Sequence, residues 1–325
     1  AMLFFHKMMP DFETGTVARR DTIFLSDPDR KVPFRIAYEG TESRYLTGAD
    51  FDTESIQVID DEVFIGDEFG PYIIRAGLDG VVREVYATEL DGKELHGPDT
   101  YSVYVPASAG SDYQVQRSGG YEGMALQPGT GLLWAMLEKP ILLEGGETEG
   151  PFLRVIAFDP EAGEWTGESG KFQLADGATA IGDFNFIDET RALVIERDNG
   201  EGDAAQACAE DATDTSDCYP NPARVKNIVL VDMSDVSEDG FVRRLGHVDL
   251  LDIADPDGVA LDGMAPAEGP FTFPFFTIED VVRVDETHIL VANDNNLPFS
   301  GGRVPGQAAH NEFILLSVPE LLSAE

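Results

Sequence analysis

Short runs of apolar residues, each closed by polar or turn-forming residues, recur along the whole chain. They are rich in β-branched and aromatic side chains and are followed by Gly, Asp, Pro or Asn, which is typical of β-strands. The expected strands include 63–65, 72–74, 132–137, 155–158, 192–195, 228–231, 289–292 and 313–316. Only 250–254 and 318–324 favour a helical turn. The pattern therefore predicts an all-β protein made of antiparallel hairpins.

A weak internal repeat narrows the choice of β architecture. Four segments contain an acidic residue, a strand, a turn, a second strand and another acidic or amide residue, namely 54–68, 122–138, 183–196 and 279–294. Because the turn falls near the middle, each hairpin returns its first and last polar residues to the same end. Equivalent strand ends surround a central channel in a β-propeller, so the repeat favours this fold. At roughly 40–50 residues a blade, the length predicts about six blades, within a range of five to seven.

We expect residues 1–325 to form a single propeller domain, interrupted by an inserted acidic loop over 199–227. Both cysteines, Cys208 and Cys218, lie in this loop. In an oxidising compartment they can form a disulfide, which the chain-entropy model values at roughly 3 kcal/mol. In a reducing compartment they stay free thiols. A metal site is disfavoured there, because no third cysteine or nearby histidine completes it.

The chain is strongly acidic, with 61 Asp and Glu against 22 Lys and Arg and a formal net charge of −39. Such a charge repels nucleic acid and anionic membrane surfaces, so neither is expected as a partner. Two interpretations of this charge compete, a solvated acidic coat and cation binding. They are compatible, because a coat accounts for the total charge and not for the placement of individual acids. No apolar run is long enough to span a membrane. We expect a monomer in the periplasm or outside the cell, whose signal peptide is not part of this sequence.

Acidic and amide side chains at the ends of the four hairpins offer the oxygen ligands that calcium prefers. Several carboxylates in one channel repel one another unless a cation or protons neutralise them, so the pattern predicts a calcium site. Solvated strand edges and tight turns are the alternative explanation for such residues. The expected metal ligands are Asp52, Glu54, Asp67, Glu68, Glu122, Glu138, Glu196, Glu279, Asn293 and Asp294.

Two basic residues stand among these acids, Lys139 after Glu138 and Arg197 after Glu196. Each can bind a substrate phosphate or pair with a neighbouring acid. A carboxylate could act as general base, so the expected catalytic residues are Glu54, Glu122, Glu279 and Arg197. Other chemistries have less support, because the five histidines show no zinc-binding spacing and no Gly-x-Ser-x-Gly elbow occurs.

At these motifs the chain resembles the family called "esterase-like activity of phytase". The resemblance runs from about Val32 to Leu316, and the matching stretches are 46–55, 65–71, 120–125, 180–184, 193–200, 273–279, 291–299 and 311–314. In that family the recurrent Glu and Asp residues are taken as the active-site group. The family name implies hydrolysis of phosphoric esters, and the analogy with calcium-dependent propeller phytases implies use of a metal.

Three functions follow as hypotheses. The first is a calcium-dependent hydrolase that acts on a small phosphorylated molecule. The second is a metal-dependent lactonase-type propeller, which the scarcity of Lys and Arg near the motifs favours as the alternative. The third is a non-catalytic propeller in which calcium only joins the blades. A chain with this charge repels a polyanion unless metal ions reverse the local field.

Overall fold

A computed structural model describes residues 1–100, 113–260 and 269–325. These residues form strands throughout, with one 3₁₀ turn, η1 (Ala204–Gln206), and one short helix, α1 (Pro319–Leu322). The helix lies where 318–324 favoured a helical turn, whereas 250–254 forms no helix. None of the helices in this described part is long and apolar enough to cross a membrane. The all-β prediction is confirmed.

The chain groups into two compact units, and its assignment as a single domain stays a prediction. The first comprises Ala1–Leu126, Gly131–Gly150 and Arg154–Ser169, and the second Gln127–Thr130, Pro151–Leu153 and Gly170–Glu325. The first unit holds one four-stranded sheet and most of another. Their strands are β3 (Thr53–Ile59), β4 (Glu62–Asp67), β5 (Tyr72–Gly77) and β6 (Val82–Ala87), then β9 (Tyr121–Leu126), β10 (Leu133–Leu137), β11 (Phe152–Asp159) and β12 (Glu164–Gln173).

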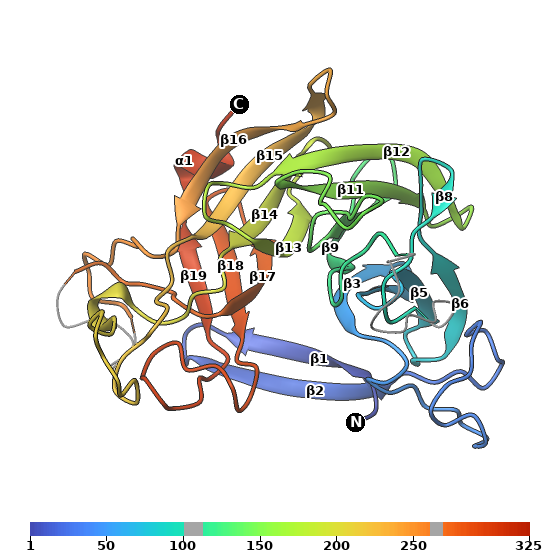
Figure 1. Ribbon diagram of the computed structural model, residues 1–325, viewed down its shortest axis with the longest axis horizontal. Helices are drawn as coiled ribbons and strands as arrows, with labels where there is room; N and C mark the ends of the chain where they lie inside the picture. The colour runs from blue at the N-terminus through green and yellow to red at the C-terminus, as the bar shows by residue number, and fades with distance from the viewer. Residues whose placement is uncertain (101–112, 261–268) are drawn as a thin grey trace. The chain divides into compact units, whose positions relative to one another are not determined.

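The second unit contains one sheet of four strands and one of three. These are β13 (Ala180–Phe186), β14 (Arg191–Arg197), β15 (Lys226–Val236) and β16 (Val242–Asp249), then β17 (Thr277–Arg283), β18 (His288–Asp294) and β19 (Phe313–Ser317). In all four sheets, consecutive strands pair antiparallel, as in propeller blades (Figure 1). Two further hairpins lie in the first unit, β1 (Phe4–Asp11) with β2 (Thr16–Phe24) and β7 (Glu89–Leu90) with β8 (Lys93–Glu94).

The fold is a β-propeller, and its described residues contain four blades rather than the expected six or so. The estimate from chain length was too high because long segments contribute no strand to any blade. Residues 25–52 and 198–225 are two such segments. A length divided by an average blade size counts these connections as if they were strands.

Apolar side chains form the core between neighbouring blades of the same unit. In the first unit, Phe64 and Ile73 pack with Met124 and Phe158. In the second, Leu193 packs in one cluster with residues of β17 and β18. Burial of this apolar surface fixes the two blades of each unit against each other and thereby the strand ends that carry the acids.

The predicted disulfide is present between Cys208 and Cys218, ten residues apart and with their Cα atoms 4.9 Å apart. We expect the Cys208→Ser/Cys218→Ser double variant to lower the free energy of unfolding by about 3 kcal/mol, because the open loop gains conformational freedom when unfolded. Urea unfolding with and without reductant measures this. Reductant should destabilise the parent chain and leave the double variant unchanged. Equal stability of the parent and the variant would contradict the expectation.

Candidate metal centre

A one-residue β-bulge stands at the same place in the first hairpin of every blade. The inserted residue, which the register with the opposite strand skips, is Glu54 in β3, Glu122 in β9, Gly182 in β13 and Glu279 in β17. A bulge bends the strand and re-aims the side chain of the inserted residue. The repeat in the sequence therefore corresponds to a structural repeat. Three of its four bulges carry the glutamates that were expected to be catalytic.

A second equivalent position lies on the neighbouring strand of each blade. The residues paired next to the bulges are Asp67, Leu137, Glu196 and Asn293. The residues that follow them are Glu68, Glu138, Arg197 and Asp294. Each of the first two blades thus places one glutamate at the bulge and another across the hairpin. In the third blade, glycine and arginine take these positions.

The acids of the first two blades form two groups that share Glu68. In each group, one carboxylate oxygen from every member lies within 4.8 Å of those of the others. The first group is Asp52, Glu54 and Glu68, and the second is Glu68, Glu122 and Glu138. Glu68, Glu122 and Glu138 are buried, at 5%, 5% and 6% exposure, whereas Glu54 is exposed. The hairpins thus bring together five of the predicted metal ligands.

Close packing of two backbones holds these groups together. A Cβ atom on Gly120 would lie 2.6 Å from the Glu68 Cα, so only glycine allows this approach. The Gly120 carbonyl accepts a hydrogen bond of 2.8 Å from the Glu138 amide. The Ser55 hydroxyl donates to the carbonyl of Tyr121 at 2.9 Å and ties β3 to β9. The backbone thus fixes the first and second blades against each other at the acids.

Burial disfavours the ionised form of two acids in these groups. Burial, reinforced by the Glu138 charge, raises the pKa of Glu68 to about 8. Burial also raises the pKa of Asp52. The Glu68 Oε1 atom is buried and has no hydrogen-bond partner. Ionising a carboxyl group whose buried oxygen has no hydrogen-bond partner is costly, and a bound divalent cation would remove that cost.

The Lys139 ammonium group contacts Glu138, one of the three buried acids. Lys139 Nζ lies 2.7 Å from Glu138 Oε2. The same Nζ donates to the carbonyl of Ser118 and, at 3.2 Å, to that of Arg117. The lysine side chain is 32% exposed, so its ammonium lies where the buried acids meet solvent.

Asp67, another predicted ligand, lies beside these acids and has a structural contact on each oxygen. Its Oδ1 accepts from the Asp52 amide at 2.8 Å, and its Oδ2 accepts from the Gly70 amide at 2.7 Å. Burial raises the pKa of Asp67 to about 7. Asp67 thus shapes the turn that presents Asp52 and Glu68, and neither carboxylate group includes it.

The predicted residues of the third blade lie in the second unit. Glu196 is buried and accepts two hydrogen bonds from Arg244, at 2.9 and 2.7 Å. It also accepts from the Ala175 amide at 2.9 Å and from Asn227 at 3.1 Å. Arg197 is buried, donates to Asn199 Oδ1 at 3.2 Å and lies over the Phe276 ring.

The predicted residues of the fourth blade also belong to the second unit. Glu279 is its bulge residue. Asn293 accepts from the Glu312 amide at 2.7 Å and donates to the His310 carbonyl at 3.1 Å. Asp294 accepts from the Asn296 amide at 3.1 Å. The carboxylate groups found among the described residues do not include Glu196, Glu279 or Asp294, whose roles as metal ligands stay predictions.

Sequence reasoning missed two cations that organise the second unit. Arg244 binds Glu196 from a strand whose pattern gives no sign of function. Lys226 is fully buried, donates to the Asp198 and Phe276 carbonyls and lies 3.2 Å from Asp198 Oδ1. Burial lowers the pKa of Lys226 to about 8. In the sequence, the only indication of these two cations is that a basic residue stands next to an apolar run.

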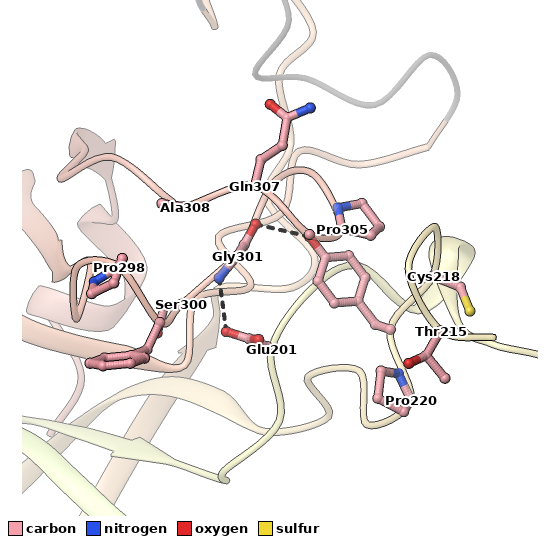
Figure 2. A pocket seen from close by; sticks show the side chains of 13 residues that line it. Glu201, Thr215, Cys218, Pro220, Pro298, Ser300, Gly301, Pro305, Gln307 and Ala308 are labelled. Atoms are coloured by element: carbon pink, nitrogen blue, oxygen red, sulfur yellow. Dashed lines mark hydrogen bonds between the residues drawn. The ribbon is translucent and has the colours of Figure 1, made fainter. Parts of the chain in front are cut away.

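A pocket of about 240 Å³ lies in the second unit, beside the disulfide loop (Figure 2). Glu201 accepts from the Gly301 amide at 3.1 Å, and the Tyr219 hydroxyl donates to the Gly301 carbonyl at 3.0 Å. Figure 2 shows the Gly301 amide directed toward the Glu201 carboxylate. The lining residues include none of the predicted ligands.

Comparison with protein families gives a match over most of the chain. The model of the family Phytase-like, described as "Esterase-like activity of phytase", matches residues 1–297. None of the curated proteins matches the chain.

Three solved structures are similar at low sequence identity. A GH43 endo-arabinanase from Bacillus licheniformis is 8% identical, with a TM-score of 0.28, over 82% of this chain and 93% of that one. The Pan2 WD40 domain from Neurospora crassa is 10% identical, with a TM-score of 0.24, over 80% and 69%. A putative 6-phosphogluconolactonase from Bacteroides fragilis is 10% identical, with a TM-score of 0.31, over 95% and 80%.

Proposed function

Because the chain belongs to the phytase-like family, we propose that it is a calcium-dependent hydrolase of phosphoric esters. The observation that carries this proposal is the group of three buried carboxylates, Glu68, Glu122 and Glu138, whose oxygens lie within 4.8 Å of one another. Asp52 and Glu54 extend it toward solvent through Glu68. Oxygen ligands alone, without histidine or cysteine, suit a hard divalent ion rather than zinc or copper.

The side chains divide into different roles in this proposal. A bound calcium ion would supply positive charge to the oxygens of a phosphate group. Glu54 is exposed at its bulge, so it can reach a water molecule and accept its proton as general base. Glu122 is buried and would serve as a ligand. Lys139 is the basic group that we propose for the substrate phosphate. Arg197 and Glu279, in the second unit, stay predictions for the same reaction.

The disulfide and the net charge support proposals for the cellular compartment and for the substrate. We propose a phosphorylated small molecule as substrate and a monomeric enzyme in the periplasm or outside the cell. The disulfide supports an oxidising compartment, where such bonds persist. The net charge of −39 supports a modestly charged ester over a polyanion such as phytate.

Removal of the metal is expected to abolish the activity. We expect the metal-free chain to hydrolyse phosphomonoesters or phosphodiesters at least about 100-fold more slowly than the calcium-loaded chain, because the phosphate charge is then not neutralised. Calcium at a hundredfold excess over its dissociation constant should also stabilise the fold by about 2.7 kcal/mol. Colorimetric assays and thermal melts, each with calcium and with chelator, measure the two effects.

Variants of the ligands and a second substrate class complete the test. Glu122→Gln and Glu138→Gln should each reduce hydrolysis, whereas Glu161→Gln, at an exposed turn, should not. Lactones are the comparison substrates. Hydrolysis of lactones without phosphoesters would replace this proposal with the lactonase alternative. Binding of calcium with no turnover of either class would leave a non-catalytic calcium-binding propeller.

A further inference from the structure

Two carboxylate groups meet at one residue in the first unit. Glu68 contributes an oxygen both to the group with Asp52 and Glu54 and to the group with Glu122 and Glu138. From this arrangement we propose that the site holds two divalent cations, bridged by the Glu68 carboxylate. This inference rests on the proposed function, because it concerns the same metal centre, and it adds the number of ions and the division of the ligands between them.

Coordination distances separate the two positions. Calcium binds oxygen at roughly 2.3–2.6 Å, so two ligands of one ion lie at most about 5 Å apart. Each group meets this limit by itself, with its oxygens within 4.8 Å of one another. The described residues form these two overlapping groups rather than one group of five. The arrangement therefore suits two neighbouring ions better than a single ion bound by all five acids.

A buried oxygen without a partner points independently to a ligand. Glu68 is 5% exposed, and its Oε1 atom has no hydrogen-bond partner. Buried polar atoms in folded proteins nearly always have a hydrogen-bond partner. The free-energy cost of burying an atom without a partner is higher for a carboxylate oxygen than for a neutral atom. A second cation would bind the lone pairs of this Oε1 atom, because a carboxylate can bind one ion with each of its two oxygens.

The two positions differ in their access to solvent. The inner position, at Glu122 and Glu138, has only buried ligands, whereas the outer position includes exposed Glu54 and half-buried Asp52. Calcium completes its six to eight ligands with water where the protein offers too few oxygens. The outer ion therefore keeps places for exchangeable ligands, so we assign substrate binding to the outer ion and blade cohesion to the inner ion.

Counting bound ions tests the proposal without measuring catalysis. The intact chain is stripped with chelator, dialysed against manganese as a spectroscopic probe for calcium, and analysed for bound metal. We expect two manganese ions per chain, with an electron paramagnetic resonance spectrum broadened by coupling between neighbouring ions. Asp52→Asn and Glu122→Gln should each retain one uncoupled ion. Glu68→Gln should weaken both positions, and the control Glu161→Gln should retain two coupled ions.

Folding of the variants is checked by thermal melts in chelator. Metal-free Glu68→Gln should melt no lower than the metal-free parent chain, because glutamine replaces the buried carboxyl group with a neutral amide of similar size. A single ion in the parent, or two uncoupled ions, would overturn the proposal. One ion with phosphoesterase turnover would overturn the two-ion centre alone. Two coupled ions without turnover would support this centre and overturn only the proposed catalytic function.

Discussion

Replacing Gly182 with alanine is expected to destabilise the second unit by about 3 kcal/mol or more. Gly182 is the bulge residue of the third blade, the position at which the other blades carry glutamate. A Cβ atom built on it overlaps the carbonyl oxygen of Ile278 and lies 2.9 Å from the carbonyl carbon. Both atoms belong to the β17 backbone, which cannot move aside as a flexible side chain can. The added methyl group must therefore separate β13 from β17.

Urea unfolding of Gly182→Ala against Gly40→Ala measures this effect. A Cβ atom on Gly40 meets nothing within 4 Å, so its alanine variant reports only the change in backbone entropy. We expect the control to remain within about 1 kcal/mol of the parent chain. A cost for Gly182→Ala no greater than that of the control would show that the third and fourth blades do not approach as closely as the structure indicates.

The same glycine shows where sequence reasoning was accurate and where it was not. The repeat of acid, strand, turn, strand and acid located all four bulged hairpins, because each of these elements has a recognisable residue type in the sequence. In the third repeat the starting acid was taken as Asp183, one residue late. Asp183 instead accepts hydrogen bonds from Val281 and Asn185, at 2.8 and 2.7 Å, and connects the two blades. Because the glycine has no side chain that matches the acids of the other repeats, the start of the third repeat was assigned to the nearest acid, Asp183.

The division of the acids between sites could not be predicted from the sequence for a related reason. A hairpin pattern tells which residues lie at one end of one blade, but not which blades face one another. Close packing at Gly120 joins the acids of the first and second blades, and the sequence carries no sign of this contact. Glu196 has the same local pattern as Glu138. Its partner Arg244 lies 48 residues further along the chain, beyond the reach of local motif reasoning.

Removal of Arg244 is expected to be nearly as damaging as the glycine substitution. We expect Arg244→Met to lower the free energy of unfolding by about 3 kcal/mol, because it leaves a fully buried carboxylate without its counter-ion. The Glu196 side chain is 0% exposed, and two Arg244 nitrogens contact its oxygens. The neighbouring Arg243 pairs with Asp235 at the surface, so Arg243→Met is a matched control that should cost at most about 1 kcal/mol.

The pH dependence of the Arg244→Met effect distinguishes lost charge pairing from lost packing. Burial acts to raise the pKa of Glu196, but the hydrogen bonds and charge of Arg244, together with the hydrogen bonds from the Ala175 amide and Asn227, outweigh it and hold the pKa below its usual range. The parent chain therefore has this stabilisation above the unfolded-state pKa and loses it as the pH falls through the lowered folded-state pKa. Without Arg244, burial dominates and the sign reverses, so protonation of Glu196 favours the folded variant. Urea unfolding at about pH 7 and about pH 4.5 should show the difference between the parent and Arg244→Met shrinking at the lower pH. A difference that is independent of pH, and not reduced by adding Glu196→Gln, would attribute the cost to packing against Phe172 instead of the ion pair.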